Sequence, residues 1–127
     1  MSVKIDAWAK RHLRDEKGKW KDGADWVLLL ALDERSLKVR QLDRATFEEY
    51  YFLVKLALMY THNHESVFIR DFWKRIKSDL GEMAERLKEK KLGYSYFSPA
   101  LRFDEMWKRV GELLNVARYR LSPERQN

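Results

Sequence analysis

The residues best suited to chemistry gather in one stretch, KRHLRDEKGKWK, which covers residues 10–21. Lysine and arginine side chains neutralise phosphates, and an aromatic ring can stack on a base. The segment therefore predicts contact with a nucleic-acid backbone, whereas the alternative is a solvated helix end and loop whose charge serves solubility. The candidate residues of this segment are Lys10, Arg11, Arg14, Lys17, Lys19, Trp20 and Lys21.

Two further cations, Arg118 and Arg120, lie near the C-terminus and have the same chemistry. We include both in the candidate nucleic-acid-binding set. If the first and last helices of the protein pack side by side, the two groups of cations would merge into one patch.

The segment THNHE, residues 61–65, raises the question of a metal site. His62 and His64 are two residues apart, and at that spacing a helix points them to different sides, so they can share a metal only from a strand or loop. The sequence has no cysteine and no H-E-x-x-H pattern. We interpret the segment as a polar interhelical loop and expect no metal and no cofactor; a metal-dependent enzyme is the weaker alternative.

Other patterns of catalysis are missing from the sequence. Carboxylates occur as the adjacent pairs Glu48-Glu49 and Asp104-Glu105, and adjacent residues on a helix do not converge on one site. There is no phosphate-binding loop, no dinucleotide fingerprint and no nucleophile elbow. The sequence therefore predicts a binding protein that is not an enzyme.

Length and composition predict one domain that spans residues 1–127. Hydrophobic residues make up 45% of the chain, enough for a packed core, and charged residues make up 36%, a proportion that resembles heat-adapted proteins. The absence of cysteine favours a reducing compartment. The apolar run Trp26–Leu32 is too short to span a bilayer, and charges interrupt the N-terminal segment, so we expect a cytoplasmic protein without a membrane segment.

Charge is distributed unevenly along the chain, whose net charge is +6. Residues 1–21 hold seven Lys/Arg and three Asp/Glu, whereas residues 22–65 hold five Lys/Arg and eight Asp/Glu. The basic ends are expected to attract polyanions such as nucleic acid.

Apolar residues at spacings of three and four predict several helices. A basic helix over 3–14 and a polar loop over 15–25 form the basic N-terminal unit, 1–22. A helix follows from Asp43 or Thr46, either of which can be its cap, to about His62, and the last helix begins near Pro99. Residues 122–127 form a tail that is expected to fray.

The clearest helix lies between Ser66, a potential N-cap, and Gly93, a typical C-terminal stop. Six apolar residues alternate at spacings of four and three along it. They are Ile69, Trp73, Ile76, Leu80, Met83 and Leu87. Helices with such seams bury them against one another, so the sequence predicts a mainly α fold, a bundle of four or five helices.

Residues 26–42 could form either of two structures. Leu37 and Val39 alternate with charged residues as in a strand, and residues 33–35 could turn the chain into a small β-hairpin. The leucines and alanines of the same stretch favour a helix, and no Gly or Asn marks a tight turn.

The segment RLKEKKLGYSYF, residues 86–97, resembles the junction of recognition helix and wing in winged-helix transcription regulators. The resemblance implies a recognition helix over 79–91, a wing over 94–103 and a break near residues 77–79. The apolar seam runs through that break without interruption, which favours one continuous helix.

Four of the five tryptophans, Trp8, Trp26, Trp73 and Trp107, lie on apolar faces and are expected in the core. Trp20 lies between lysines, so it is either an exposed contact anchor or folds back over the end of the bundle. The helix over 43–60 is apolar on more than one side, which places it centrally or at an oligomer interface.

These features support three functions. The leading hypothesis is a small, basic, non-enzymatic protein that contacts nucleic-acid backbone, DNA or RNA, as an accessory or assembly subunit. The alternatives are a protein–protein assembly subunit, including a homo-oligomer, that binds no nucleic acid, and a winged-helix DNA-binding regulator.

Overall fold

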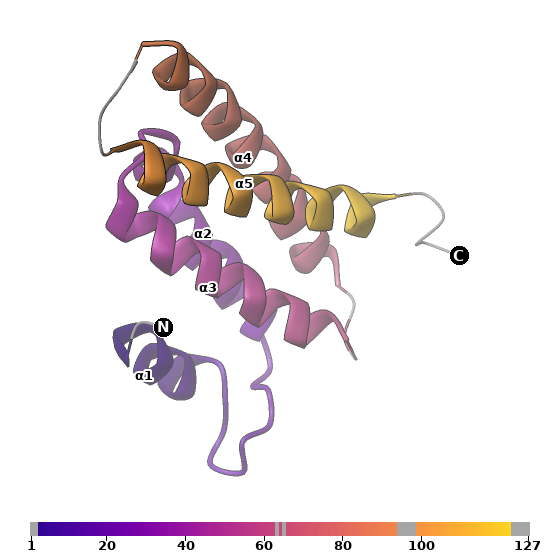
Figure 1. Ribbon diagram of the computed structural model, residues 1–127. Coiled ribbons are helices and arrows are strands. Elements are labelled where there is room, and N and C mark those ends of the chain that lie inside the picture. The colour runs from indigo at the N-terminus through magenta and orange to yellow at the C-terminus, as the bar shows by residue number, and fades with distance from the viewer. Residues whose placement is uncertain (1–2, 63, 65, 94–98, 123–127) are drawn as a thin grey trace.

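The computed structural model describes residues 3–62, 64, 66–93 and 99–122, and this part of the chain folds into five α-helices (Figure 1). The helices are α1 (Val3–His12), α2 (Ala24–Arg40), α3 (Arg44–Thr61), α4 (Val67–Gly93) and α5 (Pro99–Leu121). The predicted helical bundle is confirmed. None of the helices in these described stretches is both long and apolar enough to cross a membrane. Of the tail 122–127, only Ser122 lies within the described residues.

The sequence allowed residues 26–42 to form either a β-hairpin or a helix. Most of this stretch belongs to the single helix α2, residues 24–40, rather than to a hairpin. Leu28, Leu32 and Val39 recur at helical spacing, and none of the three is exposed to solvent. Trp26 and Leu37 lie on the outer side of the same helix and are exposed. Because α2 has apolar residues on both sides, its sequence shows no clear helical period.

α4 is one unbroken helix, as the apolar seam predicts. Ser66 caps its first turn, since the N–H of Ile69 donates to the Ser66 hydroxyl oxygen at 3.2 Å. All six seam residues are buried, none more than 2% exposed. The helix continues through residues 77–79, where a winged helix would need a break. Helix α5 covers residues 99–103 of the proposed wing, and residues 94–98 lie outside the described part.

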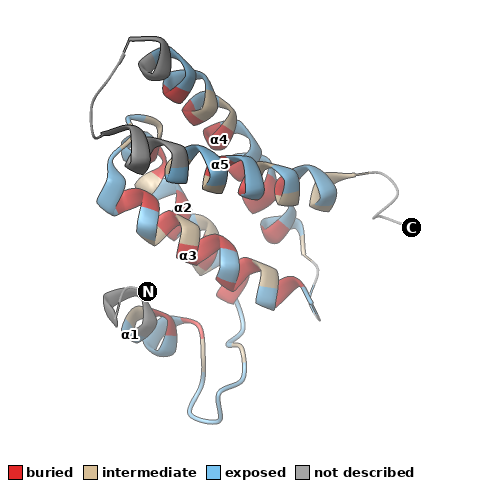
Figure 2. Cartoon of the chain, viewed as in Figure 1, coloured by how far each residue is buried: buried red, intermediate tan, exposed pale blue. Residues whose placement is uncertain are grey.

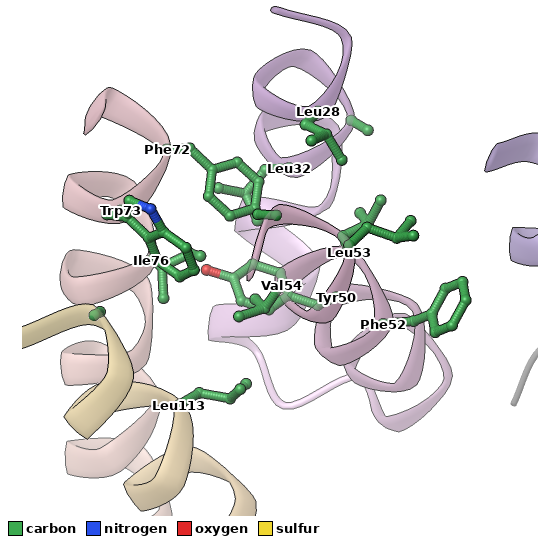
Figure 3. Close-up of a cluster of buried hydrophobic side chains, with 14 of the residues drawn as sticks. Leu28, Leu32, Tyr50, Phe52, Leu53, Val54, Phe72, Trp73, Ile76 and Leu113 are labelled. Carbon is green, nitrogen blue, oxygen red and sulfur yellow. The ribbon is translucent and has the colours of Figure 1, made fainter. Parts of the chain in front are cut away.

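Helix α3 packs mainly on α2 and has buried residues on more than one side. It begins after Asp43, whose carbonyl accepts the N–H of Phe47, so Asp43 rather than Thr46 precedes the first turn. Tyr50 points toward α4, whereas Phe52 points the opposite way (Figure 3). Both side chains are buried. The apolar surface of α3 on more than one side is therefore used within the bundle.

Helices α2 and α4 run parallel, and their contacts repeat every seven residues. The first pair is a ring contact with centroids 4.8 Å apart, and the other two are ion pairs with N–O distances of 3.0 and 3.5 Å. The pairs are Trp26 with Phe68, Arg75 with Asp33, and Arg40 with Glu82. A constant register over two heptads fixes how the two helices align.

Helix α5 packs on α4 and crosses it at a steep angle (Figure 1). Val110, Leu113 and Ala117 bury one face of α5. Arg109 ties this helix to α3, because its Nη1 lies 2.8 Å from Glu48 Oε1.

Two of the four tryptophans expected in the core are exposed. Trp73 is 2% exposed and Trp8 is half-buried, but Trp26 is 44% and Trp107 40% exposed. The expectation for Trp26 and Trp107 was wrong because both lie on helices with apolar residues outside the packed face. Buried residues concentrate where the helices meet, and the loop after α1 is largely exposed (Figure 2).

Candidate nucleic-acid interface

The basic segment 13–21 folds back on itself directly after α1. The N–H of Asp15 donates to the carbonyl of Lys19 at 2.8 Å, and the N–H of Lys21 donates to the carbonyl of Leu13 at 2.9 Å. Arg14 and Trp20 form an antiparallel bridge between the two arms. We call residues 13–21 the basic loop.

Asp15 organises the tip of the basic loop. One oxygen of its carboxylate accepts the backbone N–H groups of Lys17 and Lys19, each at 2.9 Å. Its carbonyl accepts the N–H of Gly18 at 3.0 Å, and Gly18 adopts the left-handed φ of 79° that this turn requires. The lysines at the tip therefore belong to a turn with a defined backbone.

Trp20 folds back over the end of the bundle, which is one of the two alternatives left open by the sequence. Its ring meets the ring of Tyr60 edge-on, with centroids 5.3 Å apart. The guanidinium carbon of Arg14 lies 3.9 Å from the centre of the Trp20 ring, and Arg14 also donates to the carbonyl of Gly18 at 2.8 Å. Arg14 thus covers a face of Trp20, so Trp20 positions a cation and anchors the loop.

Tyr60 links the basic loop to α3, and the sequence alone did not indicate this role. Burial, together with the charges of Asp25 and Asp22, raises the pKa of its phenol above the usual 10.0. Its ring also stacks on His64, with centroids 4.6 Å apart. Tyr60 lies 40 residues after Trp20 in the sequence, so no local pattern could have revealed their contact.

The six cations of residues 10–21 line one shallow pocket together with Asp15 and Glu16. The Lys21 ammonium donates to the carbonyl of Arg11 at 2.8 Å, which draws the loop against the end of α1. Within the described part of the chain, no ion pair joins any of these six cations to a carboxylate. Four of them are exposed cations whose charged side-chain groups make none of the hydrogen bonds described above for the loop: Lys10, Arg11, Lys17 and Lys19.

Arg118 and Arg120 lie elsewhere. Both belong to the last turns of α5, and Figure 1 shows the end of α5 far from α1. Arg120 is half-buried, with its guanidinium carbon 6.0 Å from the centre of the Trp73 ring. The two predicted groups of cations therefore do not merge, because α3 separates α1 from the helix pair α4 and α5.

The structure describes both histidines of the segment THNHE, His62 and His64. His64 is occupied by its stacking on Tyr60 and by a contact of 3.2 Å between its Nδ1 and the Tyr60 carbonyl. Among the residues that the structure describes, no three or more His, Asp or Glu side chains gather closely enough to hold a metal ion.

No family model, curated protein or solved structure matches this chain. The geometry of the basic loop is therefore the basis for a functional proposal.

Proposed function

We propose that the protein binds the phosphate backbone of nucleic acid through the pocket formed by the basic loop and the end of α1, as a cytoplasmic accessory or assembly subunit that is not an enzyme. The observation that carries this proposal is the convergence of six cations on one pocket that holds two carboxylates. Cations without carboxylate partners keep their full charge for an external anion, and release of counterions from the polymer drives such binding.

The defined conformation of the basic loop favours direct contacts with phosphates over a diffuse attraction to the polymer. The turn around Asp15 fixes the backbone from which the side chains of Lys17 and Lys19 extend, and Trp20 positions the guanidinium group of Arg14. Less conformational freedom is therefore lost on binding. Because Arg14 and Tyr60 already contact the Trp20 ring, the loop offers backbone contacts rather than base stacking. Binding is therefore expected to depend little on sequence.

The test is fluorescence anisotropy of labelled single- and double-stranded DNA and RNA over a range of salt concentrations. Contacts to about four phosphates of duplex DNA predict a slope of about −3.6 for log affinity against log salt. The variant Lys17→Glu/Lys19→Glu should bind at least about tenfold more weakly at low salt.

The matched control is Lys38→Glu/Lys108→Glu, which changes net charge equally at two exposed lysines away from the loop. It should weaken binding much less. Equal losses in both variants would show that net charge alone attracts the polymer, and an absence of binding at low salt would refute the proposal and leave a protein–protein assembly role.

A further inference from the structure

The outer face of α4 carries a second hollow, which the basic loop does not share. Two neighbouring rows of residues, each with a spacing of four, line most of it, and Leu121 of α5 and Arg86 complete it. The first row is Arg70, Lys74, Ser78 and Glu82, and the second row is Lys77, Gly81, Glu85 and Glu89. Ser78 and Gly81 lie at the middle, where no large side chain fills the surface.

Charge is ordered along these rows. The three cations lie in the N-terminal half and the three carboxylates lie in the C-terminal half. The charges are also symmetric in sequence about the midpoint between Asp79 and Leu80. For each cation that precedes this midpoint, a carboxylate follows it by the same number of residues. The matched positions are Arg70 and Glu89, Lys74 and Glu85, Lys77 and Glu82, and at the centre Ser78 and Gly81.

Within the two rows, this order places like charges next to one another. Like charges follow one another at helical spacing, Lys74 before Lys77 in one half and Glu85 before Glu89 in the other. Like charges at these spacings destabilise a helix by a few tenths of a kcal/mol each, in the same way that opposite charges stabilise it. The two rows therefore lack the alternating pattern that a solvated helix surface favours, and the opposite charges near the carboxylates come from outside the rows, from Arg86 beside them and from Arg40 on α2, which pairs with Glu82.

We propose that the protein forms a symmetric dimer in which α4 packs antiparallel against α4 of a second copy. A two-fold axis through the midpoint of the face places the first row of one subunit beside the second row of the other. Lys74 then faces Glu85 of the partner subunit, Lys77 faces Glu82 of the partner subunit, and Arg70 faces Glu89 of the partner subunit. Every contact occurs twice, as an isologous interface requires.

The rows also fit this packing sterically. Interdigitated rows with a spacing of four give the common crossing angle of about −50° between helices. Ser78 would meet Gly81 of the partner subunit at the crossing point, where small residues let two backbones approach. Nothing lies within 4 Å of a Cβ built on Gly81, so its lack of a side chain is not required by the monomer.

The dimer leaves the proposed nucleic-acid site free. The basic loop packs on α3 through Trp20 and Tyr60, whereas the dimer face belongs to α4. Figure 1 shows α1 and α4 on different sides of α3. One crossing of two helices is a small interface, so the dimer is expected to be weak and to dissociate with rising salt.

The test is sedimentation equilibrium of the full chain at increasing protein concentration. Lys74→Glu and Glu85→Lys each create two repulsive pairs in the dimer and should weaken self-association by at least about tenfold. In the heterodimer formed by an equimolar mixture of the two variants, opposite charges are restored at both pairs, and the double variant Lys74→Glu/Glu85→Lys restores both pairs in a homodimer. Recovered association in the double variant is the result expected only from this pairing.

Gly81→Gln separates loss of the dimer from loss of the fold. Glutamine has a higher helix propensity than glycine, and its Cβ meets no neighbour in the monomer, so the thermal midpoint should rise while self-association falls. A wild-type chain that stays monomeric at millimolar concentration and low salt would overturn the proposal. Single charge variants that associate as well as the wild type would also overturn it.

Discussion

The guanidinium group of Arg40 on α2 holds the fully buried carboxylate of Asp79 on α4, with Nη2 2.6 Å from Oδ1. Ser36 donates its hydroxyl to the same carboxylate at 2.8 Å, and Tyr50 on α3 donates its phenol at 3.1 Å. Asp79 thus joins three helices through one side chain. A buried charge is tolerated at this position because three side chains donate hydrogen bonds to the carboxylate, one of them a cation.

Loss of the Arg40 partner should be costly. Arg40→Met keeps the aliphatic stem but leaves the buried carboxylate without its cation, so we expect the free energy of unfolding to fall by about 3 kcal/mol. Urea denaturation at neutral pH measures this change. Arg75→Met is the matched control, since it removes the exposed ion pair with Asp33 and should cost less than about 1 kcal/mol. Equal costs would show that the Asp79 cluster adds no more than a surface pair.

Stability should also fall at high pH because of Tyr50. Burial, then the charge and hydrogen bond of Asp79, raise the pKa of this phenol well above 10.0. Above pH 10 the unfolded chain loses the Tyr50 proton while the folded chain keeps it, so the unfolded state binds fewer protons and is favoured as pH rises. The stabilisation is present below pH 10 and decreases by up to about 1.4 kcal/mol per pH unit above it.

Urea denaturation between pH 8 and pH 11 tests this linkage. Tyr50→Phe should lower stability by about 1 kcal/mol at neutral pH, because it removes one donor to Asp79, yet should flatten the decline above pH 10. Tyr119→Phe, at an exposed position, is the control and should keep the decline. An unchanged decline in Tyr50→Phe would assign the effect to other groups.

The turn around Asp15 allows loop order to be separated from charge. Asp15→Asn and Asp15→Ala raise the net charge equally, but only asparagine retains an oxygen that can accept the N–H groups of Lys17 and Lys19. If an ordered loop binds phosphates, the alanine variant should bind duplex DNA several-fold more weakly than the asparagine variant. Equal affinities in the anisotropy assay would show that charge acts without the turn.

Local sequence patterns predicted most of the helices well, but they did not predict which residues far apart in the sequence contact one another. The α4 seam could be predicted because six residues at regular spacing must share one face. Asp79 lies next to Leu80 in that seam, and its burial depends on Ser36 and Arg40, about 40 residues earlier. In the same way, the cations of the basic loop are close in sequence and had to be close in space, whereas the contact between Trp20 and Tyr60 depends on how the basic loop packs on α3.

Two glycines should respond in opposite ways to alanine. Gly111 lies inside α5, and nothing lies within 4 Å of an added Cβ, so Gly111→Ala should stabilise the protein by about 0.5–1 kcal/mol through helix propensity. Gly18 has a φ of 79°, which alanine adopts only at a cost, so Gly18→Ala should destabilise the protein by about 1 kcal/mol.

Nucleic-acid binding gives the second comparison between the two glycine variants. Gly18→Ala should reduce the affinity for duplex DNA because the turn that presents Lys17 and Lys19 is strained, whereas Gly111→Ala should leave the affinity unchanged. Thermal unfolding and anisotropy on the same preparations measure both effects. An affinity that is insensitive to Gly18→Ala, in a variant shown to be less stable, would mean that the backbone of the basic loop supports the fold but not the binding.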